Sequence, residues 1–102
     1  MREKKMISKK EITEKLKMVI DPELGIDIET LGLVYEITPS LPKPKIKMTL
    51  TSPMCPYGPQ LIADVKMKVK ELKGVGEVEV EITFDPPWEP SEEVKMMLGM
   101  VQ

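Results

Sequence analysis

The sequence predicts an α+β fold, a two-layer sandwich in which helices pack on one three-stranded sheet. Two stretches carry apolar residues at helical spacing, and three others alternate apolar with polar residues. These patterns follow one another in the order α-β-β-α-β, with a short helix at the C-terminal end. The chain has 102 residues, of which 41% are hydrophobic, so we expect a single domain spanning residues 1–102.

The first helix begins at a capping box. Ser8 is followed three positions later by Glu11, and Ile7 and Ile12 flank the box as a hydrophobic staple. We expect the helix to end at Pro22, because proline disfavours helical geometry in the residue before it. The apolar stripe expected on this helix consists of Ile12, Leu16, Val19 and Ile20.

Two strands follow a stretch rich in acids and turn formers. Residues 21–32 predict a loop or a single turn. Residues 33–37 alternate in the manner of a strand, and residues 45–51 alternate more regularly still. Three prolines punctuate the connection between these strands, so the two strands are well separated in the sequence.

The second helix follows a proline-bracketed loop at residues 51–59. Its apolar face runs from Leu61 to Leu72, and Gly74 stands where a glycine often follows a helix. The third strand should turn Val78, Val80, Ile82 and Phe84 inward. Its glutamates should face Lys45 and Lys47 of the second strand. We expect the second helix to connect strands that run in the same direction, and a last short helix to begin near Ser91.

Composition excludes several function classes. The chain contains no histidine and one cysteine, so neither a nucleophile–histidine pair nor an ordinary zinc site fits within one chain. Its net charge of −2 predicts no nucleic-acid binding. No apolar run is long enough for a transmembrane helix, and the charged N-terminus does not look like a signal peptide. We therefore expect a cytoplasmic protein.

Cys55 is the first candidate for function. It precedes a predicted helix, whose N-terminal N–H groups and dipole favour a thiolate, and Pro53 and Pro56 stiffen its loop. The alternative is a small hydrophobic residue in the core, because free cysteine is among the most buried residue types. The local pattern leaves both interpretations open.

The acidic stretch supplies a second candidate. Asp21 and Glu23 flank Pro22, and Asp27 and Glu29 follow. Paired carboxylates can bind a metal ion or transfer protons. The alternative is that Asp21 caps a short turn and the other carboxylates are solvated.

The third candidate follows the last strand. Asp85, Pro86, Pro87 and Trp88 place an aromatic residue behind two prolines. This arrangement predicts either a partner-binding surface formed by Asp85, Pro87 and Trp88, or a tryptophan that folds back over the open end of the sheet.

Three segments together resemble the iron–sulfur cluster assembly domain family. This family includes small stand-alone SufT-like and PaaD-like domains and is related to the eukaryotic cytosolic targeting factors for iron–sulfur proteins. The matching segments are VIDPELGIDIETLGLVYEI at 19–37, MTLTSPMCPYGPQL at 48–61 and GVGEVEVEITFDPPWEP at 74–90. PaaD-like members carry additional cysteines and some relatives carry a P-loop ATPase; this sequence has neither, which favours the SufT-like subgroup.

The resemblance implies a non-catalytic accessory factor, not an enzyme, in iron–sulfur cluster assembly or in the maturation of iron–sulfur proteins. It makes Cys55 the functional thiol and a possible metal ligand. The D-P-E motif falls on residues 21–23 and the D-P-P-W motif on residues 85–88. The supporting loop of the thiol consists of Thr51, Ser52, Pro53 and Pro56.

Two mechanisms follow from these residues. Clusters usually take four protein ligands, mostly thiolates, and one chain offers a single thiol. We therefore expect no stably bound cofactor on one chain, but a transient iron–sulfur cluster or iron shared with an assembly protein, a client apoprotein or a second copy in a homodimer. Asp21 or Glu23 would then lie near Cys55. The alternative is an adaptor without metal that docks client proteins around Trp88.

Overall fold

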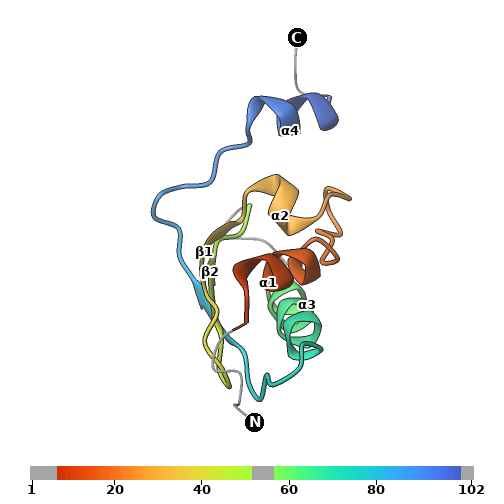
Figure 1. Cartoon of the computed structure of the whole chain (residues 1–102). Coiled ribbons are helices and arrows are strands. Elements are labelled where there is room, and N and C mark those ends of the chain that lie inside the picture. Colours follow the sequence, from red (N-terminus) through yellow and green to blue (C-terminus); the bar gives the residue numbers. More distant parts are fainter. Residues whose placement is uncertain (1–6, 52–56, 100–102) are drawn as a thin grey trace.

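Helices α1 (Lys9–Leu16) and α3 (Gly58–Lys70) lie on one side of a three-stranded sheet, which gives two layers (Figure 1). This computed structural model describes residues 7–51 and 57–99. The remaining elements are α2 (Ile28–Leu31), β1 (Val34–Thr38), β2 (Lys45–Met48), β3 (Glu79–Ile82) and α4 (Glu92–Met97). The predicted fold class and element order are confirmed, with the addition of the one-turn helix α2.

The sheet has the order β1-β2-β3 and contains both kinds of pairing. β1 pairs antiparallel with β2 and has a register shift between Val34 and Glu36, whereas β2 pairs parallel with β3. A parallel pair needs a long crossover, and α3 supplies it, as predicted. The predicted contact between glutamates and lysines is confirmed by Lys45, whose Nζ lies 2.7 Å from Glu81 Oε1 and 4.0 Å from Glu79 Oε2.

The hydrophobic core lies between the helices and the inner face of the sheet. The capping box predicted for α1 is present, since the Ser8 hydroxyl accepts a hydrogen bond from the Glu11 N–H at 3.0 Å. Ile7 and Ile12 are both buried beside it. The fully buried side chains are Ile12, Leu16, Val19, Ile28, Leu31, Leu33, Ile46, Met48, Leu61, Val65, Val69 and Val94.

Three details of the predicted elements are wrong. α1 ends at Leu16 rather than at Pro22, because the chain turns there and Ile20 pairs with Asp27 in an isolated β-bridge. That pairing leaves the Ile20 side chain 48% exposed instead of on the apolar stripe. Phe84 is 42% exposed rather than inward, because β3 ends at Ile82 and the chain leaves the sheet.

The C-terminal segment forms an arm that ends in α4, beyond α2 and away from the sheet (Figure 1). Ser91 caps this helix as predicted, and its hydroxyl accepts a hydrogen bond from the Val94 N–H at 3.1 Å. Val94 is buried, whereas Met96 and Met97 are exposed. No helix in residues 7–51 or 57–99 is both long and apolar enough to span a membrane.

Candidate functional site

The predicted thiol loop connects the end of β2 to the start of α3. Ser52, Pro53, Cys55 and Pro56 lie outside the described residues. Thr51, the one described residue of the predicted supporting loop, is half-buried. Cys55 therefore stands in the sequence three positions before α3, which begins at Gly58, in agreement with the expected helix entry.

The start of α3 is packed closely against the strand side of this connection. A Cβ at Gly58 would lie 3.0 Å from Leu50 Cδ1, so a larger side chain would force a shift here. Tyr57 occupies the N-cap position without a side-chain cap, Pro59 lies in the first turn, and that turn contains no acidic residue. The partial positive charge of this helix end is therefore not neutralised by a carboxylate of its own first turn.

Asp21 organises the turn of the D-P-E motif. Its Oδ1 accepts hydrogen bonds from the N–H groups of Glu23 at 2.8 Å and Leu24 at 3.1 Å, and its carbonyl accepts one from Gly25 at 2.7 Å. The predicted turn-capping role of Asp21 is confirmed. The side chain is fully buried, however, and Oδ2 has no hydrogen-bond partner. Pro22 and Glu23 are exposed.

The next two carboxylates, those of Asp27 and Glu29, are half-buried. One of the two sequence interpretations had placed them in solvent. Asp27 caps α2 and accepts hydrogen bonds from the Thr30 N–H at 2.9 Å and hydroxyl at 2.7 Å. Glu29 is half-buried, and its Oε2 is buried without a hydrogen-bond partner. Burial raises the pKa of Glu29, the charge of Asp27 raises it further, and Lys17 partly opposes both effects. The sequence pattern named Glu29 but did not predict the burial of its carboxylate.

Trp88 folds back onto the body of the protein, as one of the two sequence interpretations predicted. Its indole Nε1–H donates to the Leu31 carbonyl at 2.6 Å, and the ring packs against the core. The Tyr35 hydroxyl donates to the Pro86 carbonyl at 2.9 Å. These two hydrogen bonds hold the start of the C-terminal arm. Gly32, with φ +78°, turns the chain between α2 and β1 beneath the indole.

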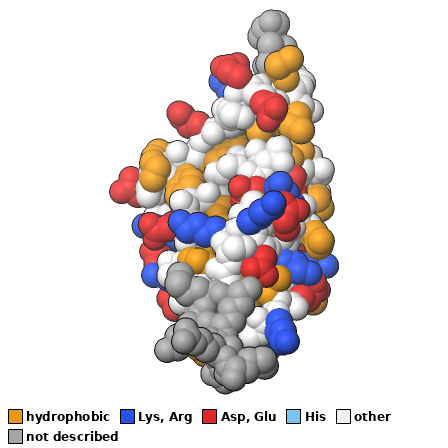
Figure 2. Space-filling view, in the orientation of Figure 1, with side chains coloured by type: hydrophobic (Ala, Val, Ile, Leu, Met, Phe, Trp, Pro, Cys, Tyr) orange, Lys and Arg blue, Asp and Glu red, His pale blue; other side chains and the backbone are white. Residues whose placement is uncertain are grey.

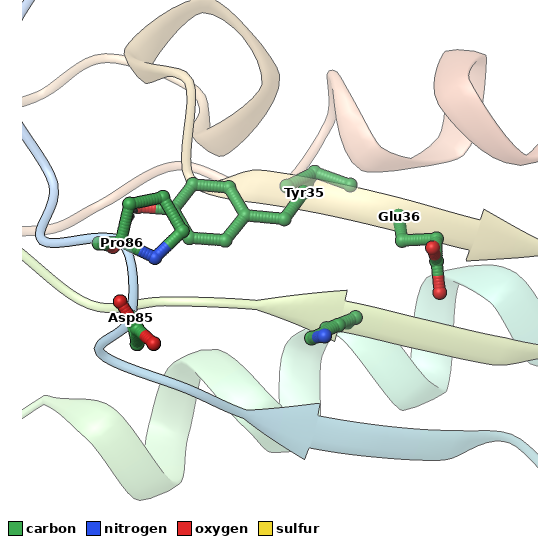
Figure 3. A pocket seen from close by; sticks show the side chains of 6 residues that line it. Tyr35, Glu36, Asp85 and Pro86 are labelled. Atoms are coloured by element: carbon green, nitrogen blue, oxygen red, sulfur yellow. Dashed lines mark hydrogen bonds between the residues drawn. The ribbon is translucent and has the colours of Figure 1, made fainter.

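A hollow of about 390 Å³ lies where this arm crosses the sheet (Figure 3). The Tyr35 ring points toward Pro86, Glu36 projects from the same strand farther along, and Asp85 lies on the arm. Lys47 of β2 also lines the hollow. Asp85 and Pro86 of the D-P-P-W motif therefore border an open hollow, while the Trp88 indole N–H is occupied within the protein.

Charged side chains of both signs share one face of the protein. Figure 2 shows lysines and acids interleaved across the middle of the molecule, with hydrophobic side chains between them and above. The visible face therefore presents no broad patch of a single sign.

Comparison with known proteins shows which family this chain resembles in sequence. A sequence model of the family described as iron–sulfur cluster assembly protein matches residues 9–82. The chain is 50% identical over 72 residues to the Fe–S protein maturation auxiliary factor SufT of Staphylococcus aureus, covering 70% of this chain and 82% of that protein. It is 41% identical over 96 residues to the Fe–S protein maturation auxiliary factor YitW of Bacillus subtilis, covering 90% and 94%.

A solved structure agrees with these relatives. A conserved hypothetical protein of Thermotoga maritima has a TM-score of 0.80 at 42% identity, covering 95% of this chain and 99% of that one. Fold and motifs define a small α+β domain with one cysteine between a strand and a helix. The chain belongs to the iron–sulfur cluster assembly protein family. The family resemblance and the SufT-like subgroup predicted from the sequence are confirmed.

Replacing Trp88 by Phe should loosen the arm. Trp88→Phe removes the donor to the Leu31 carbonyl, and a lost hydrogen bond that leaves a partner unsatisfied costs about 1–3 kcal/mol. The free energy of unfolding, measured by urea denaturation, should fall by about that amount. Tyr35→Phe, which removes the more exposed bond to Pro86, should cost less. Equal stability of Trp88→Phe and wild type would show that this bond does not anchor the arm.

Replacing Glu29 by Gln should stabilise the protein at neutral pH. A carboxyl whose folded pKa lies above its ordinary value of 4.5 binds its proton more tightly in the folded state. Its contribution is therefore full at low pH and is lost as pH rises through the folded pKa. The excess stability of Glu29→Gln over wild type should appear as pH rises above the ordinary pKa of a glutamate and vanish below it.

The matched control for this prediction is Glu92→Gln. Glu92 is exposed and pairs with Lys95 at 3.8 Å, so its removal should give no such pH-dependent gain. Urea denaturation of the three proteins between pH 3 and pH 8 compares them. A Glu29→Gln variant that is less stable than wild type at pH 7 would show that the ionised Glu29 carboxylate does not destabilise the folded protein.

Proposed function

We propose that this protein is a non-enzymatic accessory factor in the maturation of iron–sulfur proteins. The Cys55 thiolate supplies one ligand to a transient iron–sulfur cluster, or to a single iron ion. A second subunit or a client apoprotein supplies the other ligands at the same time. The cluster is cargo that passes through the site, and one chain does not keep it.

Family membership carries the role in iron–sulfur protein maturation. The family match extends over residues 9–82, and relatives named Fe–S protein maturation auxiliary factors align with most of the chain. Auxiliary factor in iron–sulfur protein maturation is therefore the function that sequence and fold support best.

The inventory of ligands supports a shared cluster. The chain has one cysteine and no histidine, whereas clusters are usually held by four protein ligands, mostly thiolates. Residues 7–51 and 57–99 contain no group of three or more His, Cys, Asp or Glu that would hold a metal ion. The proposed sources of the missing ligands are iron–sulfur assembly proteins, client apoproteins or a second copy in a homodimer.

Asp21 is the proposed helper of the thiol. A fully buried carboxylate oxygen without a partner is costly, because it has lost its water and gained no donor. We assign to Asp21 Oδ2 the role of orienting the thiol or ligating iron beside Cys55. Glu23, also predicted for this role, is exposed and is the weaker choice.

The proposal includes no catalysed reaction. A cysteine nucleophile normally needs a base such as histidine, which this chain lacks. The proposal also places the protein in the cytoplasm, where a single thiol stays reduced. A metal-free adaptor that docks partners around Trp88 is less well supported, because the indole N–H is already bonded to Leu31.

Cys55→Ser should abolish function without unfolding the protein. In cells that lack the chromosomal gene, this variant should lower the activity of an iron–sulfur-dependent hydratase on the order of tenfold relative to wild type, because a cluster ligand is missing. The assay compares hydratase activity at equal amounts of hydratase polypeptide. Full complementation by Cys55→Ser would exclude a role of the thiol.

Asp21→Asn tests the negative charge of the Asp21 carboxylate separately from its role in capping the turn. Asparagine keeps an oxygen that accepts from Glu23 and Leu24, so the urea midpoint should change little. Anaerobic reconstitution with iron and sulfide should load less iron on Asp21→Asn than on wild type, and none above background on Cys55→Ser. Wild-type loading of Asp21→Asn would remove Asp21 from the proposed site.

A further inference from the structure

β1 is an edge strand whose outer side has no partner strand in the described part of the chain. The sheet order puts β1 first, so β2 pairs with one of its edges only. Among residues 7–51 and 57–99, no backbone hydrogen bond other than those of its pairing with β2 reaches the stretch from Val34 to Ile37. An unpaired strand edge presents N–H and C=O groups that can pair with another chain.

A groove of about 260 Å³ lies between this edge and α1. Lys9 and Thr13 of α1 form one wall, and Glu29 of α2 also lines the groove. The residues that β1 contributes are Val34, Tyr35, Glu36 and Ile37. The groove therefore combines a free strand edge, apolar side chains and a carboxylate.

One carboxylate that lines the groove has an oxygen without a hydrogen-bond partner. Glu29 Oε2 is buried without a partner. Lys17, the cation that acts on Glu29, pairs with Glu14 at 3.4 Å. Asp27 is occupied by Thr30. The charged side chains that the described part of the chain contributes to the groove are the carboxylates of Glu29 and Glu36 and the ammonium group of Lys9.

We propose that the outer edge of β1 binds an extended segment of a partner protein by strand addition, with a lysine or arginine of that segment paired to Glu29. Main-chain hydrogen bonds would provide affinity, and the charge pair would select basic segments. The register shift between Val34 and Glu36 interrupts the edge, so only a short segment pairs regularly. This surface goes beyond the proposed function and does not require the thiol.

The other edge strand fits a basic segment less well. Glu79 of β3 lies 3.7 Å from Lys43 Nζ, and Glu81 lies 2.7 Å from Lys45 Nζ. These carboxylates are already paired and exposed, so a new cation would gain little there. The unpaired buried oxygen of Glu29 distinguishes the β1 edge.

The probe is a blocked seven-residue peptide of alternating valine and lysine, titrated into the full chain. Backbone amide shifts in NMR spectra should concentrate on Val34–Thr38. Glu29→Gln should weaken binding about tenfold, equivalent to about 1.4 kcal/mol. Glu92→Gln, which removes an exposed carboxylate of α4 outside the groove, should leave the affinity within a factor of two of wild type. A peptide N-methylated at every residue should not bind, because neither of its two strand edges then has N–H groups to donate.

Several results would overturn the proposal. These are shifts centred on β3 or α4, equal affinity of wild type and Glu29→Gln, equal binding of a valine–glutamate peptide, or equal binding of the N-methylated peptide. Tighter binding after deletion of residues 1–6 would also overturn it, because the chain's own basic N-terminus would then be the occupant. Cys55→Ser should bind the peptide as wild type does, so this test is separate from that of the proposed function.

Discussion

Parallel pairing of β2 with β3 is the constraint on which the rest of the structure depends. Parallel neighbours cannot be joined by a hairpin, so the chain must leave β2, cross through α3 and return. The connection that contains Cys55 is thereby fixed between the end of a central strand and the start of a helix. The close contact of Gly58 with Leu50 holds the helix side of that connection against the strand side.

The same end of the sheet gathers the other family motifs. The turn capped by Asp21 leads into α2, whose Leu31 carbonyl accepts the hydrogen bond from Trp88. The D-P-P-W motif thus has a structural role, because Trp88 connects the arm after β3 to α2, the helix before β1. The D-P-E motif has both a structural reason in its Oδ1 contacts and an unexplained buried Oδ2. The proposed site explains that oxygen by giving it a role beside the Cys55 thiol.

Local patterns predicted what local physics determines. The capping box at Ser8, the alternation in β2 and the cap of α4 were readable because each depends on neighbours in the sequence. The early end of α1 was not, because the bridge from Ile20 to Asp27 replaces helical turns. The strain on Glu29 and the choice between two positions for Trp88 depend on tertiary contacts; Trp88 bonds a residue 57 positions away. The placement of Cys55 lies outside the described residues and stays a prediction.

The most direct test of the central claim, a single activated thiol before α3, is the alkylation rate of Cys55 on the folded protein across pH 5 to 10. Because the chain has one cysteine, the rate reports that thiol alone. The account predicts rapid reaction with an apparent pKa below that of a free cysteine, as expected beside the positive end of a helix. A thiol that stays inert until the protein is unfolded would contradict it and would make Cys55 a core residue.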